Sequence, residues 1–237
     1  MEQVLNFMSD PRNDFGGHTT AYLSLCAVPI ALAIVIGLLL GILVARRPAA
    51  AFVAGNVSGL ARAIPTLAFL AAVLPYLGIG FTPAVVALTA LGVPPVLLNT
   101  VAGLRGIDPA VIDSARGMGM RPRQILARVE IPLVLPVVAA GIRTSAVQIV
   151  ATAPLAALIG AGGYGDYILA GVNLLQQVPL LVGAGSVALL ALGVEIALAG
   201  VERAVTPTGL RISAAESRSA VGRNLSTVRV QLRRRYP

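Results

Sequence analysis

The sequence contains no lysine and no tryptophan, and it has only one cysteine and one histidine. All 18 basic residues are arginines, which excludes both a phosphate-binding loop of the Gly-Lys-Ser/Thr type and a Schiff-base lysine. Cys26 has no second cysteine for an internal disulfide, and His18 alone cannot form a multi-histidine metal site. If the protein uses nucleotide energy, another chain must therefore bind the nucleotide, and no cofactor is expected on this one.

Charged side chains are scarce, at 12% of residues, which is about half the share of an ordinary soluble domain. Hydrophobic residues make up 57% of the chain, and the mean hydropathy is +0.85. These values argue against a free-standing soluble domain and a disordered chain, and they favour an all-α membrane protein. The length allows one domain, with an N-terminal segment over 1–18, a transmembrane domain over 19–203 and an Arg-rich tail over 204–237.

Five apolar segments are long enough to cross a bilayer, which takes about 20 mostly apolar residues. The first segment carries no charge and follows an acidic stretch, so its length and its flank argue against a cleaved signal peptide. A charged stretch over 105–130 separates the third segment from the fourth, and a glycine-rich connection over 160–171 separates the fourth from the fifth. The predicted spans are residues 19–45, 49–77, 81–104, 131–153 and 179–201.

The distribution of arginine predicts the orientation of these spans, because basic flanks stay on the cytoplasmic side. Five spans divide the flanks into two alternating sets, of which one holds 15 arginines and the other holds only Arg12. We therefore expect a multi-pass membrane protein with its N-terminus outside and its C-terminus in the cytoplasm. We expect the Arg-rich tail to be a solvated, disordered segment drawn to anionic lipid, because it lacks the fold or interleaved aromatics that nucleic-acid binding needs.

Three charged residues fall inside the predicted spans, where such residues are costly and face protein or water. Arg143 and Glu195 lie at depths that allow an ion pair, which would either stabilise the structure or line or gate a pathway. Arg62 lies between Gly59 and Pro65, where the second span is expected to be interrupted and to offer a free backbone carbonyl to the guanidinium.

Two glycine pairs, Gly37 with Gly41 and Gly55 with Gly59, have the spacing that lets membrane helices approach closely. The chain holds 25 glycines, so ordinary packing explains this spacing better than a specific contact does. Prolines inside the spans predict kinks, which are typical of a bundle around a pathway and are also common in membrane proteins that transport nothing.

The charged stretch between the third and fourth spans predicts a short helix. Asp108 followed by Pro109 is typical of a helix start, because the carboxylate caps the first turn and the proline ring fits it. The helix is expected to run to about Arg116, where Gly117 and Gly119 end it and allow a sharp turn.

This helix is too short to be stable alone in water, and it places apolar side chains beside charged ones. Such a helix fits the groove of a partner protein or a layer of lipid headgroups, and the spacing favours neither. A second helix is expected to begin near Arg121 and to run into the fourth span at Ile131 and Pro132. The apolar residues of the first helix and its end are Val111, Ile112, Ala115 and Met118.

The order of residues in this loop resembles the cytoplasmic signature of ATP-binding-cassette importer permeases, which is Glu-Ala-Ala, three residues, Gly, nine residues and Ile-x-Leu-Pro. Here the string from Asp113 to Gly119 is followed, after nine residues, by Val129-x-Ile131-Pro132. The spacing agrees, although Asp113 and Ser114 replace Glu and Ala. Stretches similar to the permeases for osmoprotectants (glycine betaine, carnitine, choline) are residues 63–68, 115–120, 124–126, 128–133, 140–144 and 158–165.

The resemblance covers about residues 20 to 205 and implies a type I importer of a bacterial inner membrane, in which this chain forms the translocation path. The implied partners are two cytosolic ATPase subunits that carry ATP and Mg²⁺, a second permease (identical or related) and an extracytoplasmic substrate-binding protein. ATP-driven closure of the ATPases would move the loop helix as a rigid lever. The residues implied for ATPase coupling are Asp108, Val111, Ile112, Asp113, Ala115, Arg116, Gly117, Gly119, Arg121, Ile131 and Pro132. Those expected along or near the path are Arg62, Pro65, Arg143 and Glu195.

Aromatic residues are few, five Phe and five Tyr, so an aromatic cage for a quaternary ammonium is expected in the binding protein. Tyr164 and Tyr167 fall near the predicted outer boundary, where they either anchor the chain at the membrane interface or contact the docked binding protein. Three other hypotheses stay open: a permease for methionine or another small solute, an ATP-independent secondary transporter, and a membrane enzyme acting on lipid.

Overall fold

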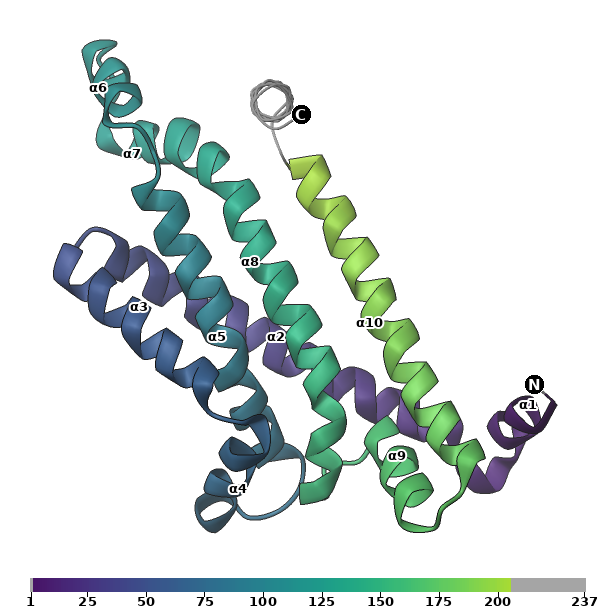
Figure 1. Cartoon of the computed structure of the whole chain (residues 1–237). Helices are drawn as coiled ribbons and strands as arrows, with labels where there is room; N and C mark the ends of the chain where they lie inside the picture. Colours follow the sequence, from purple (N-terminus) through teal and green to yellow (C-terminus); the bar gives the residue numbers. More distant parts are fainter. Residues whose placement is uncertain (1, 206–237) are drawn as a thin grey trace, which may run out of the picture.

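The computed structural model describes residues 2–205, and the regular elements in this part of the chain are all helices, without strands (Figure 1). Within it, four helical segments are long and apolar enough to cross a membrane, and a bent pair of helices makes a fifth candidate. The prediction of an all-α membrane protein with about five spans is confirmed. The helices concerned are α2 (Phe15–Ala45), α5 (Phe81–Arg105), α8 (Ile131–Thr152), α10 (Gln177–Val205) and the bent pair α3 (Pro48–Ala63) and α4 (Thr66–Leu77).

Helices α2, α5 and α8 form the centre of the bundle, and glycines set how closely α2 and α5 approach. A Cβ added at Gly37 would lie 2.6 Å from Val96 Cβ, and one added at Gly41 would lie 2.6 Å from Thr100 Cβ. Real Cβ atoms are never this close, so the glycine pair on α2 marks a close contact between helix backbones.

The second predicted span, 49–77, is divided in the structure into α3 and α4, which meet at an angle of 95°. Ile64 is extended (φ −74°, ψ 124°), because a residue that precedes proline is disfavoured in the helical region. The interruption predicted between Gly59 and Pro65 is therefore confirmed.

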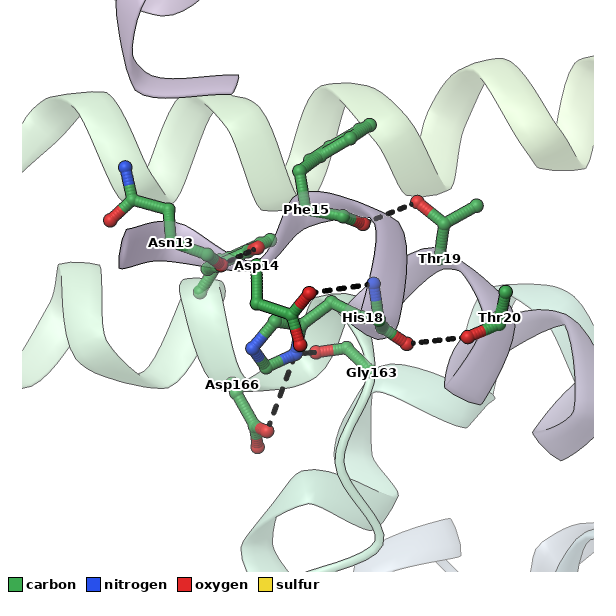
Figure 2. Close-up of polar contacts among 10 residues, drawn as sticks. Asn13, Asp14, Phe15, His18, Thr19, Thr20, Gly163 and Asp166 are labelled. Atoms are coloured by element: carbon green, nitrogen blue, oxygen red, sulfur yellow. Dashed lines mark hydrogen bonds and ion pairs between the residues drawn. The ribbon is translucent and has the colours of Figure 1, made fainter. Parts of the chain in front are cut away.

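Both ends of the described chain add helix beyond the predicted spans. A short helix α1 (Glu2–Ser9) and a 3-10 turn (Pro11–Asn13) precede α2, which begins earlier than predicted. Asp14 caps α2, because its Oδ1 accepts a hydrogen bond from the Gly17 N–H at 3.1 Å (Figure 2). At the other end α10 continues to Val205, and the Arg-rich tail beyond it lies outside the described residues.

The glycine-rich connection contains a helix that the sequence pattern did not predict, α9 (Tyr164–Asn173). Figure 2 shows how its beginning is attached to the beginning of α2. His18 Nδ1 lies 3.1 Å from the Gly163 carbonyl oxygen and 3.7 Å from a carboxylate oxygen of Asp166. These contacts join residues about 145 positions apart in the sequence, which explains why a local pattern did not indicate them.

Tyr164 and Tyr167 are buried between α9 and the N-terminal segment, with 5% and 6% of their surfaces exposed. The Tyr164 hydroxyl donates to Thr19 Oγ1 at 2.9 Å, and the Tyr167 hydroxyl donates to the Asn13 carbonyl at 2.6 Å. Burial, together with the nearby Asp14 carboxylate, raises the pKa of Tyr167 to about 12, so its hydroxyl remains a donor at physiological pH. The expectation that these tyrosines face the membrane interface is wrong, and their burial also argues against contact with a docked binding protein.

Candidate coupling site

Helix α6 (Pro109–Gly117) begins where the sequence predicts. Asp108 Oδ1 accepts a hydrogen bond from the Ala110 N–H at 2.9 Å, and Pro109, which has no N–H to satisfy, occupies the first helical position. In Figure 1, α6 lies beyond the ends of α5 and α8, at the edge of the bundle. This local sequence therefore specifies a short helix that stands apart from the spans.

The end of α6 is a tight turn at Gly119, which has a φ of 79°. The Met120 N–H donates to the Ala115 carbonyl at 3.2 Å, and the Gly119 N–H donates to the Arg116 carbonyl at 2.9 Å, which is the bond pair of a Schellman motif. A Cβ at residue 119 would meet nothing within 4 Å, so the left-handed backbone alone favours glycine here. Gly117 lies in the last helical turn and needs no such conformation.

The surface of α6 combines apolar and charged side chains. Val111 is 41% exposed and Met118, directly after the helix, is 75% exposed, whereas Ala115 is buried and Ile112 is half-buried. Apolar side chains exposed beside polar ones on so short a helix are typical of a surface that a partner covers.

An ion pair joins Asp113 to Arg116 on the exposed side of α6, with 3.2 Å between Oδ1 and Nη1. Both side chains are at least 68% exposed, so the pair contributes at most about 1 kcal/mol. A docking partner can therefore replace this pair with little loss of stability. Asp113, which stands where the signature has its acidic residue, is accessible to such a partner.

The second loop helix, α7 (Pro122–Ile125), leads directly into the fourth span. Its start is capped by a hydrogen bond of 2.8 Å from the Arg121 N–H to Gln124 Oε1. Residues 126–130 form one π-helical turn and join α7 to α8, where Ile131 is exposed and Pro132 is half-buried. The helical path is continuous over 122–159, and this continuity connects the turn after α6 rigidly to a membrane-spanning helix.

Two hollows of about 350 and 500 Å³ lie between α6 and the neighbouring ends of the spans. Arg46, at the end of α2, and Glu130, just before α8, line both hollows, and sequence reasoning missed them as site residues. The available signal was their position, because each is a charged residue that flanks an apolar span. The first hollow is lined by Ala45, Arg46, Leu104, Ile107, Pro109, Ile112, Asp113, Arg116 and Glu130.

Arg143 joins α8 to α10 through two carboxylates. Its Nη1 lies 3.4 Å from Glu195 Oε1, and its Nε lies 3.3 Å from Glu202 Oε2. The predicted ion pair between Arg143 and Glu195 is therefore present. Glu202, which the sequence analysis placed after the last span, is a second acidic partner of Arg143. Glu195 and Glu202 are seven residues apart, which is about two helical turns, so they lie on the same face of α10. This spacing was the available sequence signal that both could contact one arginine.

Arg62 and Pro65 lie at the bend between α3 and α4, away from the residues just described. Arg62 is exposed in the last turn of α3 and has no hydrogen bond or ion pair with any residue from 2 to 205, so the expected backbone partner is wrong. The structure thus brings the loop residues together at one site and the Arg143 group at another. Among residues 2–205, no group of three or more His, Cys, Asp or Glu side chains is placed to hold a metal ion.

Comparison with known proteins identifies the family. Residues 33–207 match the family described as the binding-protein-dependent transport system inner membrane component. The chain is 42% identical over 212 residues to the carnitine transport permease protein OpuCB of Listeria monocytogenes, covering 89% of this chain and 97% of that protein. It is 35% identical over 211 residues to the choline transport system permease protein OpuBB of Bacillus subtilis strain 168, with the same coverage of 89% and 97%.

The fold is also similar to that of the MetNI methionine ABC transporter in an inward-facing conformation. The TM-score is 0.74 at 24% identity, and the match covers 84% of this chain and 100% of that chain. An identity this low shows the fold alone, whereas the family match and the two permeases extend over most of this sequence. The chain therefore belongs to the inner-membrane permeases of binding-protein-dependent, ATP-binding-cassette transport systems, and it is a multi-pass membrane protein.

Proposed function

We propose that this chain is the permease subunit of an ATP-driven importer for a quaternary-amine osmoprotectant such as glycine betaine, carnitine or choline. The observation that carries the proposal is α6, a capped helix with exposed apolar side chains that stands beyond the bundle at the position of the coupling signature. The names of the relatives at 42% and 35% identity, a carnitine and a choline permease, support the substrate class.

The proposed division of labour follows from what this chain lacks. Without a single lysine it has no phosphate-binding loop, so ATP and Mg²⁺ bind to separate ATPase subunits. With only ten Phe and Tyr residues and no Trp, it leaves tight recognition of the cation to an extracytoplasmic binding protein. Two permease subunits, identical or related, then form the path.

In this mechanism the ATPase holds the exposed side of α6 and displaces it when the ATPase dimer closes. The turn at Gly119 passes the displacement to α7, and the continuous helical path over 122–159 passes it to α8. Arg143 joins α8 to α10, so the two helices move together between inward-open and outward-open arrangements.

The test is import by the assembled transporter in proteoliposomes, with its ATPase, its binding protein and radiolabelled glycine betaine, carnitine or choline. We expect uptake that requires ATP, and we expect it to be lost when the ATPase subunit is omitted. Uptake that continues without any ATPase would contradict the importer proposal. Uptake of methionine with no uptake of any quaternary amine would contradict the substrate class and leave the importer proposal standing.

A further inference from the structure

One face of α8 carries three polar side chains that form no hydrogen bond to another helix. Thr144, Gln148 and Thr152 follow one another at intervals of four residues, which places them on the same face of the helix. Thr144 is exposed, and Gln148 and Thr152 are partly exposed. We call this set the α8 polar face.

The neighbouring helices contact α8 directly beside this face, because Gly141 and Ser145 are each seven residues before a member of the set. Ser145 is buried, and its Oγ donates across to the Gly92 carbonyl of α5 at 2.7 Å. Gly141 packs against Asn99 of α5, and Arg143 reaches α10. Figure 1 shows α8 between α5 and α10, and the partial exposure of Gln148 and Thr152 and the exposure of Thr144 show that neither neighbour covers this face completely.

Hydrogen bonding within the chain leaves this face incompletely satisfied. The Thr144 hydroxyl donates to the Ala140 carbonyl at 2.9 Å, and the Thr152 hydroxyl donates to the Gln148 carbonyl at 2.8 Å, so both bonds stay within α8. Across residues 2–205, the Gln148 side-chain amide has no hydrogen-bond partner. An amide placed against hydrocarbon without a hydrogen-bond partner is strongly unfavourable. The α8 polar face must therefore meet water or other polar groups.

The contact between Ser145 and Gly92 fixes the depth of this face in the membrane. Gly92 lies eleven residues after Phe81 and thirteen before Arg105, so it is near the middle of α5. Thr144, next to Ser145, is then near the middle of the span. At about 1.5 Å per residue, Gln148 lies roughly 6 Å and Thr152 roughly 12 Å further from the end that carries α6.

We propose that Thr144, Gln148 and Thr152 line the translocation pathway for a quaternary amine, from the middle of the membrane toward the side on which the substrate is delivered. This inference rests on the proposed function. A quaternary ammonium has no N–H to donate, so hydroxyl oxygens and an amide carbonyl are sufficient to face its polarised methyl groups.

The same face is suited to passage and not to tight binding. Between Ile131 and Thr152 there is no acidic and no aromatic residue, so α8 offers the cation neither a carboxylate partner nor a cage. Conduction needs contacts weak enough for the substrate to leave, and spaced polar oxygens provide them.

The test uses the assembled transporter with Cys26→Ser, which removes the chain's single cysteine. Gln148→Cys and, separately, Thr144→Cys are treated with a methanethiosulfonate that carries a trimethylammonium group, a charged probe shaped like the substrate. Leu39→Cys on α2 is the matched control, because Leu39 is 58% exposed on an apolar surface. A thiol facing hydrocarbon stays protonated and unreactive, so we expect Gln148→Cys to react at least about tenfold faster than Leu39→Cys. We also expect saturating glycine betaine during turnover to slow that reaction.

The outcomes separate this inference from the proposed function. If Gln148→Cys and Thr144→Cys both react as slowly as Leu39→Cys, in the nucleotide-free and the ATP-bound transporter alike, the α8 polar face is sealed between subunits and the inference is wrong. Continued import of glycine betaine by the unlabelled transporter would show that the proposed function still holds. If Gln148→Cys does not assemble, the result for Thr144→Cys decides, because that position is exposed and its hydroxyl bonds only within α8.

Discussion

Helices α2 and α3 carry the same glycine spacing, but the structure uses it in only one of them. A Cβ added at Gly37 or Gly41 of α2 would lie 2.6 Å from a side chain of α5. A Cβ added at Gly55 or Gly59 of α3 would meet nothing within 4 Å. A pair of small residues therefore permits another helix to approach closely, and the tertiary fold determines whether a helix lies there.

The same difference separates two regions of the molecule. Helices α2, α5 and α8 form a closed region, in which small side chains and a buried hydroxyl bring backbones together. Helices α3 and α6 and the part of α10 after Gly183 lie at separate places around the bundle and together make up what we call the open region, in which Gly185, Gly193 and Gly200 of α10 would each accept a Cβ without contact. Packing in the closed region stabilises the fold of this chain, and the open region offers surface that lipid or another subunit can cover.

The largest predicted effect compares these regions directly through Gly37→Leu and Gly55→Leu. Leucine at 37 overpacks the contact with Val96, so we expect a loss of about 3 kcal/mol or more in the free energy of unfolding, or a failure to fold. Leucine at 55 enters open space and is a better helix former than glycine, so we expect a change within about 1 kcal/mol. Thermal unfolding of the purified permease in detergent measures both. Equal losses would show that the two regions do not differ.

The next effect concerns the Arg143 group, where the closed and open regions meet. Arg143→Leu removes the cation shared by Glu195 and Glu202, whereas Glu195→Gln leaves Arg143 with Glu202. We expect a loss of roughly 2 kcal/mol in unfolding free energy for the arginine variant and less than half of that for the glutamine variant. The same thermal assay checks the ranking, and the reverse order would show that Glu195 carries the contact.

A smaller effect is expected at the turn after α6, entirely within the open region. Gly119→Ala forces a side chain into a left-handed backbone and costs about 1 kcal/mol locally. We expect lower import per ATP hydrolysed, because the turn no longer holds α6 at its original angle to α7. Gly117→Ala is the matched variant, since residue 117 has an ordinary helical backbone, and we expect it to lose less. The measurement is the ratio of substrate uptake to phosphate release in both variants. An equal fall of this ratio in Gly117→Ala and Gly119→Ala would contradict a special role for the turn.

The smallest effect is expected at the start of α6. Asp108→Ala removes the cap on the Ala110 N–H and destabilises the helix by about 1 kcal/mol, without a change in global thermal stability. We expect roughly fivefold faster amide hydrogen exchange over residues 110–113. Ser114→Ala serves as the control, because its hydroxyl bonds only the Ala110 carbonyl within the same helix. Unchanged exchange in the Asp108 variant would mean that packing, and not the cap, holds this helix.

Features set by local residue order could be predicted from the sequence. Long apolar runs indicated the spans, the Asp108-Pro109 pair indicated the start of α6, and glycine and proline indicated the break in the second span. Each of these depends on residues within a few positions of one another, so a single stretch of sequence contains the whole cause.

Features set by distant contacts could not be predicted in the same way. Tyr164 and Tyr167 look like interfacial aromatics in sequence, but hydrogen bonds to Thr19 and Asn13 bury them. The helix α9 in the glycine-rich segment depends on the same packing. Glu202 was missed because it lies at the end of its span, and only the position of Arg143 on another helix makes it a partner.

The most direct test of the central claim, that α6 is where an ATPase acts on this permease, is cysteine crosslinking from Val111, which is 41% exposed on α6. Val111→Cys in a Cys26→Ser chain is crosslinked to the ATPase in native membranes, with and without ATP. We predict a crosslinked product whose yield changes with ATP, and no modification by an impermeant thiol reagent added outside the cell. Modification from outside, with no crosslink to the ATPase, would contradict the claim.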